Sequence, residues 1–203
     1  MILMPGTRAR AALISLLLSL AASDLIAQWG VTTGIRAPRF SGGAVEPATG
    51  RSLRPYRPTM WEIGVDRMGR RVGVGLRLNY ASSSLALEGD DALAAVKDAL
   101  EVYGIDPEIS VRLTRIGPGG LVRLYAGPLF EVWKLPDVGS HLRLGLGASV
   151  GLEIPFGGRW VGSARLGGAV TPSSPFAEED LDPPLEPRAL WRREASAALH
   201  YRL

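Results

Sequence analysis

Most of the chain alternates between apolar and polar residues with a period of two, which is typical of a β-strand whose two faces meet different surroundings. In the clearest run, from Leu142 to Ile154, seven apolar residues share one face, and glycine, serine, arginine and glutamate share the other. A second clear run extends from Val72 to Tyr80. Weaker runs begin at Trp29, Trp61, Ile109, Val122, Trp160 and Ala195. The pattern therefore predicts an all-β fold with eight strands.

The connections between these runs alternate in length. Long, Pro/Gly-rich or charged segments cover residues 37–57, 82–106 and 172–188, and residues 134–140 form an intermediate one. Tight connections fall at residues 68–70, 117–120 and 155–158. This rhythm is typical of an up-and-down antiparallel barrel with two different rims, and transmembrane barrels have short periplasmic turns and long extracellular loops. We therefore expect an eight-stranded transmembrane β-barrel.

The first residues look like an export signal. Arg8 and Arg10 precede a twelve-residue apolar run, Ala11 to Ala22. A membrane-spanning helix needs about twenty apolar residues, so this run is too short to be one. A basic start followed by a short apolar core is the pattern of a signal peptide. We predict cleavage after Ala27, which divides the chain into a signal peptide (1–27) and a barrel domain (28–203).

Composition narrows the classes of function. The 203 residues include no Cys, which excludes disulfides, thiolate metal sites, a cysteine nucleophile and a lipoprotein anchor. Two His residues leave little room for a His-rich metal site, and we expect no cofactor. The net charge is only +3, so the composition does not indicate nucleic-acid binding. Gly (25) and Pro (15) make up about a fifth of the chain, as expected for strands and turns rather than membrane helices.

Alternation alone does not say which face points inward. A soluble, lipocalin-like periplasmic carrier would bury the aliphatic face, whereas a membrane barrel would bury the charged one. Gly and Ser are frequent between the charges, which suits the narrow interior of an eight-stranded barrel. Aromatic residues lie near the ends of the apolar face, where interfacial girdles belong. These residues are Trp29, Trp61, Tyr80, Phe130, Trp160, Trp191 and Tyr201. The membrane barrel is the better interpretation.

The charged face predicts a network of ion pairs in the lumen. A buried charge is tolerated when it is paired and hydrogen-bonded, and arginine pairs with carboxylates bidentately. Side chains fill an interior of this size, so a wide diffusion channel is excluded, while a gated pore remains the alternative to a closed plug. The predicted lumen residues are Arg36, Glu62, Asp66, Arg77, Glu108, Arg112, Arg123, Glu131, Arg143, Glu153, Arg165, Arg192 and Glu194.

The end of the sequence carries a family resemblance. Leu199, Tyr201 and Leu203 alternate as in the C-terminal assembly signal of bacterial outer-membrane barrels, with Leu203 in place of the usual terminal Phe. The barrel domain resembles the small eight-stranded outer-membrane proteins of the OmpA-membrane-domain and OmpX type. The resemblance implies a Gram-negative outer-membrane location, contact with outer-membrane lipid and lipopolysaccharide, and recognition by the barrel assembly machinery. We expect a monomer with a structural or surface-interaction role.

An outer-membrane enzyme is the alternative class, for example one that modifies lipid A. Only His141 and His200 offer imidazoles, and Ser196 lies about 13 Å from His200 along an ideal strand, too far for a nucleophile–base pair. The His-x-Ser of lipid A deacylases is absent. We expect no enzymatic activity. The acidic cluster Glu178, Glu179, Asp180 and Asp182 is interpreted as a solvated loop rather than a cation site.

Two loop features remain. Residues 90–103 predict a short helix, with Asp90 as N-cap and Gly104 as its stop, and with Leu93, Val96, Leu100 and Tyr103 on one stripe. Such a helix would cover the barrel mouth or serve as a partner- or lipid-binding element. The first long loop is rich in arginine, either solvated or paired with lipopolysaccharide phosphates. The residues concerned are Arg36, Arg39, Arg51, Arg54 and Arg57.

Overall fold

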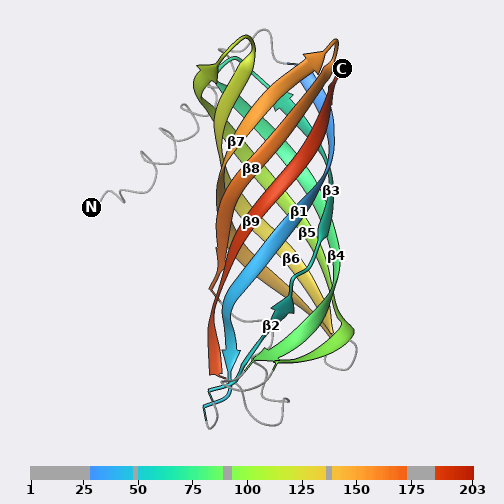
Figure 1. Cartoon of the computed structure of the whole chain (residues 1–203), viewed down its shortest axis with the longest axis vertical. Coiled ribbons are helices and arrows are strands. Elements are labelled where there is room, and N and C mark those ends of the chain that lie inside the picture. Colours follow the sequence, from blue (N-terminus) through green and yellow to red (C-terminus); the bar gives the residue numbers. More distant parts are fainter. Residues whose placement is uncertain (1–27, 48–49, 89–92, 136–138, 173–185) are drawn as a thin grey trace, which may run out of the picture.

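The computed structural model describes residues 28–47, 50–88, 93–135, 139–172 and 186–203, and the strands among them form one closed β-sheet (Figure 1). Among these residues, no helix has the length and apolar character needed to cross a membrane. The strands are β1 (Gln28–Val45), β2 (Ser52–Tyr56), β3 (Met60–Met68), β4 (Val72–Glu88), β5 (Leu93–Ile116), β6 (Gly120–Leu135), β7 (Gly139–Gly157), β8 (Trp160–Thr171) and β9 (Glu186–Arg202).

The sheet closes because its last long strand returns to its first. From β3 to β9, each strand pairs antiparallel with the next along the chain, and β9 pairs with β1 from Gly30–Arg202 to Val45–Glu186. The ring therefore has eight positions, β1 followed by β3 to β9. Closure leaves no exposed edge in the ring. The predicted eight-stranded, up-and-down antiparallel barrel is confirmed.

The ninth strand, β2, lies beyond the end of β3 in the same position of the ring. Ala44 of β1 is opposite Leu53 of β2, and Tyr56 of β2 is opposite Ser84 of β4. Arg57, between β2 and β3, has a positive φ of 46°, which marks the bend between the two strands. The prediction of a long loop over residues 37–57 was wrong in extent. β1 and β2 continue the barrel wall into this segment and leave only a short connection between them.

The helix predicted over residues 90–103 is not present in the described part of that segment. Residues 93–103 belong to β5, with Val96 opposite Leu85 and Val102 opposite Ala81 of β4. A lone helix here would have to find cover for its apolar stripe, whereas a strand extends an existing ladder. Tertiary pairing overrides local helix propensity in such cases. Asp90 to Ala92 lie outside the described residues.

The short connections gather at one end of the barrel, which we call the turn end, and the opposite end is the loop end (Figure 1). Gly117, Gly119, Gly157 and Gly158 have φ between +56° and +117°, a conformation that glycine adopts without steric cost. The tight turns thus fall at the predicted connections, although β7 continues to Gly157 and leaves only residues 158–159 between it and β8. In the connection between β8 and β9, residues 173–185 lie outside the described part, and with them Glu178, Glu179, Asp180 and Asp182.

The barrel exposes its apolar face and buries its charged face. Trp61 and Ile63 are 64% and 58% exposed, whereas Glu62 between them is 1% exposed. The same alternation of exposed apolar and buried polar residues runs along the neighbouring strands. Soluble proteins rarely expose so large a contiguous apolar surface. The fold therefore exposes the apolar face of the strands and buries the charged face, as expected for a barrel surrounded by lipid.

Aromatic side chains on the outer face lie toward both ends of this apolar band. Trp160 stacks edge-on against Tyr201 toward the turn end, with ring centroids 4.8 Å apart. Tyr80 lies against Tyr103 toward the loop end, with centroids 5.2 Å apart. Ten positions separate Tyr201 from Trp191 on β9, which is about 33 Å along the strand and about 23 Å of height at a 45° tilt. That height matches the lipid-facing band of about 25 Å in outer-membrane barrels.

Candidate functional site in the barrel lumen

Near the loop end, the lumen is filled by apolar side chains that we call the apolar plug. Trp133 is completely buried, and its ring packs edge-on against Phe40 with centroids 5.7 Å apart. The plug consists of Ala44, Met60, Ala81, Leu85, Leu100, Val102, Trp133, Leu135 and Leu190, with Phe40 and Leu53 packed against it. Apolar packing therefore closes this part of the barrel.

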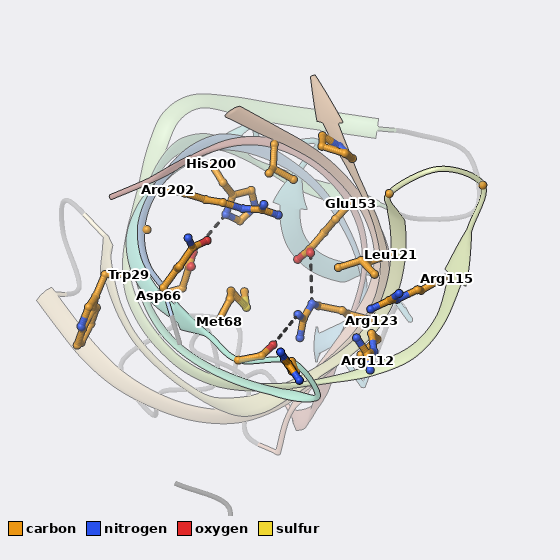
Figure 2. A pocket seen from close by; sticks show the side chains of 18 residues that line it. Trp29, Asp66, Met68, Arg112, Arg115, Leu121, Arg123, Glu153, His200 and Arg202 are labelled. Carbon is orange, nitrogen blue, oxygen red and sulfur yellow. Dashed lines mark hydrogen bonds and ion pairs between the residues drawn. The ribbon is translucent and has the colours of Figure 1, made fainter. Parts of the chain in front are cut away.

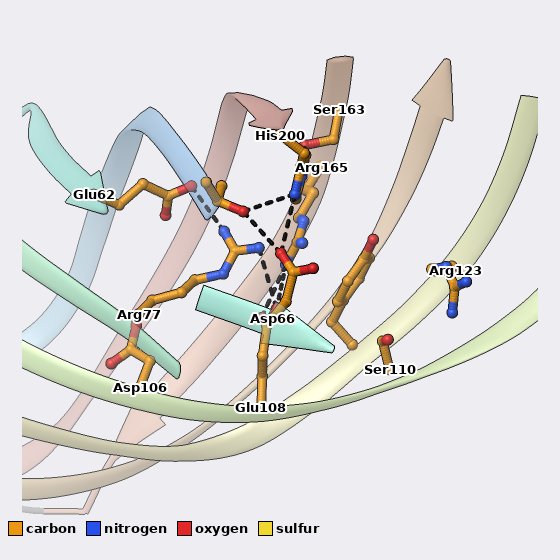
Figure 3. Close-up of polar contacts among 12 residues, drawn as sticks. Glu62, Asp66, Arg77, Asp106, Glu108, Ser110, Arg123, Ser163, Arg165 and His200 are labelled. Carbon is orange, nitrogen blue, oxygen red and sulfur yellow. Dashed lines mark hydrogen bonds and ion pairs between the residues drawn. The ribbon is translucent and has the colours of Figure 1, made fainter. Parts of the chain in front are cut away.

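The middle of the lumen holds a connected set of buried ion pairs, the central network (Figure 3). Glu62 accepts hydrogen bonds from Arg36 Nη2 at 2.9 Å and from Arg77 Nη1 at 2.8 Å. Arg77 Nη2 also lies 3.1 Å from Glu108, which accepts a 2.9 Å hydrogen bond from Arg165 Nη1. Each guanidinium reaches a carboxylate on another strand, so the network ties β1, β3, β4, β5 and β8 together.

A second arm of the network runs toward the apolar plug. Arg192 Nη1 donates to Glu131, and Arg192 Nε lies 3.0 Å from Glu194. The other oxygen of Glu131 accepts a 3.1 Å hydrogen bond from the indole of Trp133. Arg36 Nη1 donates to Asp106 at 3.0 Å and lies 3.7 Å from Glu194. Glu131 thus connects the central network to the apolar plug.

A third arm extends toward the turn end. Arg123 Nε donates to Glu153 at 3.2 Å, and the Tyr125 hydroxyl donates to the same carboxylate at 2.6 Å. The guanidinium of Arg165 lies 3.3 Å from the centroid of the Tyr125 ring, a cation–π arrangement. Tyr125 therefore bridges the central network and the Arg123–Glu153 pair.

The structure brings most of the predicted lumen residues together, but not all. Asp66 lies 3.2 Å from His200 Nδ1 and accepts a hydrogen bond from Thr32 rather than pairing with an arginine. Arg112 faces the turn-end opening, and Arg143 lies half-buried on β7. The predicted residues found in the ion pairs described above are Arg36, Glu62, Arg77, Glu108, Arg123, Glu131, Glu153, Arg165, Arg192 and Glu194.

Sequence reasoning missed several members of the network. Asp106 accepts hydrogen bonds from Arg36 and from Asn79, the latter at 2.7 Å. Asp106 falls within the predicted loop 82–106, because Pro107 and the helix-like spacing of the preceding residues hide the strand pattern. The alternation of exposed Tyr103 and Ile105 with inward Asp106 is the signal that identifies it. Tyr125 was missed because its aromatic ring does not mark it as a charge partner.

At the turn end, the lumen opens into a cavity of about 450 Å³, which we call the vestibule (Figure 2). Its charged lining consists of Arg70, Arg112, Arg115, Arg123, Arg202, Asp66 and Glu153, and the imidazole of His200 lies beside them. A much smaller cavity of about 40 Å³ lies in the middle of the barrel beside Arg36 and Arg165, and we call it the central cavity. Within the described residues, no group of three or more His, Cys, Asp or Glu is arranged to hold a metal ion.

Ser163, His200 and Asp66 form a row across the inner wall of β8, β9 and β3 (Figure 3). Ser163 Oγ lies 3.0 Å from His200 Nε2, and Asp66 Oδ2 lies 3.2 Å from His200 Nδ1. The Thr32 hydroxyl is 2.7 Å from the same Nδ1 and donates to Asp66 at 2.9 Å. The distances resemble a nucleophile–base–acid arrangement. Ser163 lines neither the vestibule nor the central cavity, so we interpret the row as a polar support of the wall.

The three residues of the predicted assembly signal end the lipid-facing side of β9. Leu199 and Leu203 are exposed on the outer face, and Tyr201 is half-buried against Trp160. The backbone N–H of Leu203 donates to the Trp29 carbonyl at 2.9 Å. Their alternation therefore continues to the last described residue.

The fold is that of the small outer-membrane β-barrels. Pseudomonas aeruginosa OprG matches with a TM-score of 0.58 at 9% identity, over 87% of this chain and 96% of that one. Neisserial surface protein A matches with a TM-score of 0.56 at 10% identity, over 86% and 97%. A major outer membrane protein from Thermus thermophilus matches with a TM-score of 0.52 at 15% identity, over 88% and 100%. No family model and no curated protein matches the sequence.

Proposed function

We propose that this chain is an integral bacterial outer-membrane protein with a closed lumen and a structural or surface-interaction role. The observation that carries the proposal is the reversed burial of the strands, with Glu62 buried between the exposed Trp61 and Ile63. The aromatic residues at two levels of the apolar band and the similarity of fold support it. In this orientation, the turn end faces the periplasm and the loop end faces the outside.

A detergent-folded sample tests the membrane part of the proposal. Folded outer-membrane barrels resist unfolding in detergent, so an unheated sample should migrate differently from a boiled one in electrophoresis. A protein that stays soluble and folded without detergent would instead favour the lipocalin-like carrier. The two outcomes are exclusive, because the exposed apolar band needs either lipid or detergent to cover it.

Planar-bilayer conductance tests the closed lumen. The apolar plug and the central network lie in series along the barrel, and an eight-stranded interior is filled by its side chains. We expect no large, steady conductance from the unmodified protein. A large open conductance would contradict the closed lumen and favour the gated-pore alternative, in which the ion pairs exchange partners.

Lipopolysaccharide phosphates are the proposed partners of an arginine pair on the outer face. Arg39 of β1 lies opposite Arg193 of β9, and both side chains are exposed near the loop end. Like charges directly opposite each other repel unless an anion lies between them, and arginine binds phosphate bidentately. The double variant R39Q/R193Q should lower retention of lipopolysaccharide during purification. R159Q removes one exposed arginine at the opposite, turn end of the barrel and should not.

The assembly machinery is the second proposed partner, through Leu199, Tyr201 and Leu203. Replacing Leu203 by the usual terminal aromatic, Leu203→Phe, should leave insertion intact or speed it, whereas Tyr201→Asp should slow it. The measurement is the appearance of the heat-resistant folded form over time. Equal rates for Tyr201→Asp and the unmodified chain would contradict the proposal. Mass spectrometry of lipid A with and without the protein tests the enzyme alternative, and we expect no change.

A further inference from the structure

Three arginines gather on the β5–β6 wall of the vestibule (Figure 2). Arg112 lies directly opposite Arg123 in the ladder, and Arg115 lies opposite Leu121. The register shifts between Arg112 and Thr114, and this irregularity brings Arg115 to the same inner side as Arg112, three positions away. Like charges opposite each other in an antiparallel pair are destabilising, and this wall concentrates positive charge.

The carboxylates of the vestibule do not neutralise this charge. Its lining has five arginines against two carboxylates, Asp66 and Glu153. Asp66 is engaged by Thr32 and His200, and Glu153 by Tyr125 and Arg123. Within the described residues, no ion pair joins Arg112, Arg115 or Arg202 to a carboxylate. Arg112, Arg115 and Arg202 therefore leave an excess of positive charge in the vestibule.

Arg123 carries an unused donor in this wall. The residue is 3% exposed, and its Nε and Nη2 donate to Glu153 and to the Gly69 carbonyl at 3.2 Å each. Its Nη1 has no hydrogen-bond partner in the structure. A buried donor without a partner is costly, and a buried guanidinium more so. Arg123 thus brings a guanidinium with one unsatisfied donor to the wall that it shares with Arg112 and Arg115.

We propose that the vestibule binds the phosphate group of a soluble organic phosphate ester that enters from the turn end. A phosphate offers acceptor oxygens to several guanidinium forks at once, and its two negative charges match the excess better than one carboxylate does. Met68, Leu121 and Val161 supply an apolar wall for the organic part. The volume of about 450 Å³ lies within the usual range of small-molecule sites, about 300–1,000 Å³.

The closed lumen makes the vestibule a dead-end binding pocket. Beyond Arg123 and Glu153, the central network and then the apolar plug fill the barrel toward the loop end. A ligand that enters between the short turns therefore leaves by the same opening. The proposal does not depend on the membrane location, because binding is measurable on the folded barrel in micelles.

Isothermal titration calorimetry of the folded protein in octyl glucoside, which contains no phosphate, tests the proposal with glycerol 3-phosphate. We expect saturable binding that the R112Q/R115Q variant weakens at least tenfold. R159Q removes an exposed arginine at the same end that does not line the vestibule, and its affinity should stay within twofold. Absence of saturable binding, or equal affinity of R112Q/R115Q, overturns the proposal.

Two further arms define the ligand class and its source. Sodium acetate should bind at least tenfold more weakly than glycerol 3-phosphate, and equal affinity overturns the assignment to phosphate. After reconstitution with phosphatidylglycerol, native mass spectrometry should show the same lipid retention for the unmodified protein and for R112Q/R115Q. Loss of lipid from the variant alone, without binding of glycerol 3-phosphate, overturns the soluble source in favour of a lipid headgroup.

If R112Q/R115Q does not fold, R112K/R115K keeps the charge but not the planar forks and should bind with intermediate affinity; unchanged affinity overturns the proposal.

Discussion

Arg36 reaches Glu62 along a diagonal of the β1–β3 ladder, over a glycine. In register, Glu62 lies opposite Gly34, and Arg36 lies opposite Met60. Arg36 Nη2 lies 2.9 Å from Glu62 Oε2. On the neighbouring strands, a Cβ added at Gly64 would lie 3.1 Å from Arg77 Cγ, and one at Gly75 would lie 3.3 Å from Glu108 Cγ. Glycines and charges on the inner face are therefore parts of one arrangement, in which small residues make room for long, paired ones.

Removing the carboxylate at the centre of the network should destabilise the barrel strongly. Glu62→Ala leaves Arg36 and Arg77 without a shared partner, and breaking a buried pair costs about 3–5 kcal/mol. We expect a loss of this size in the free energy of unfolding, measured by urea titration in lipid vesicles, together with increased bilayer conductance. Glu101→Ala removes a carboxylate from an exposed pair with Lys134, 3.5 Å apart, and should cost less than about 1 kcal/mol. Equal losses for the two variants would contradict the network's role.

The apolar plug should contribute stability by packing. Trp133→Ala removes a fully buried indole and should cost about 3–5 kcal/mol of unfolding free energy. Trp133→Phe keeps most of the ring volume and its contact with Phe40, so the loss should be smaller. The same urea titration measures both variants. A Trp133→Ala barrel as stable as the unmodified one would show that the loop end is closed by something other than this packing.

Inner-face glycines should tolerate a methyl group only where the wall leaves space. At Gly167, an added Cβ would lie 2.4 Å from the Ala148 carbonyl oxygen and 2.4 Å from Ser149 Cβ. At Gly147, the nearest atoms to such a Cβ would be 3.6 Å away. Gly167→Ala should therefore lower the free energy of unfolding by about 1–3 kcal/mol in the urea titration, as for other overpacked sites. Gly147→Ala should leave the free energy of unfolding nearly unchanged. A larger loss for Gly147→Ala than for Gly167→Ala would refute this account of the glycines.

If the barrel spans a membrane as proposed, the loss of unfolding free energy caused by a charge on the outer face should depend on the depth of that charge in the bilayer. Val150 is exposed on β7, between the two aromatic levels. Val150→Arg should cost about 2–4 kcal/mol in vesicles, whereas Ser82→Arg, on the outer face beyond Tyr80, should cost about 0–1 kcal/mol. In a soluble carrier, both substitutions on an exposed face would be nearly neutral. Urea titrations of the two variants thus separate the membrane barrel from the carrier.

The Ser163–His200–Asp66 row should be unreactive. Ser163 is 7% exposed and lines neither the vestibule nor the central cavity, so neither cavity brings an acyl or phosphoryl group to its hydroxyl. We expect no labelling of the folded protein by a fluorophosphonate probe, read by mass spectrometry. Labelling that Ser163→Ala abolishes would instead point to an activated nucleophile and to the enzyme alternative.

The alternation of apolar and polar residues predicted the regular part of the barrel wall better than the segments near the loop end. Alternation around Glu62 and Arg77 predicted that they share a face with the other charges, because side-chain direction in a strand depends only on parity. The Gly/Ser content of that face and the aromatic residues on the other predicted that it points inward. Beyond the regular runs, Pro107 and the helix-like spacing of Leu93, Val96 and Leu100 outweighed the strand signal. This segment has helix-compatible spacing but forms a strand, because β4 offers it hydrogen-bonding partners on both sides of the register shift between Ser83 and Leu85. Asp106 was lost from the predicted network for the same reason.

By itself, the sequence determined the strand periodicity, the tight glycine turns and the sorting of charge to one face, because these depend on neighbours along the chain. The signal peptide over residues 1–27 stays a prediction. Only the tertiary structure decided which charges meet, such as Arg36 with Asp106 across the lumen. It also decided that Arg112 and Arg115 face the vestibule together, and that β2 extends the wall beyond β3. Pairings of this kind depend on the closure and register of the barrel, which bring distant strands together.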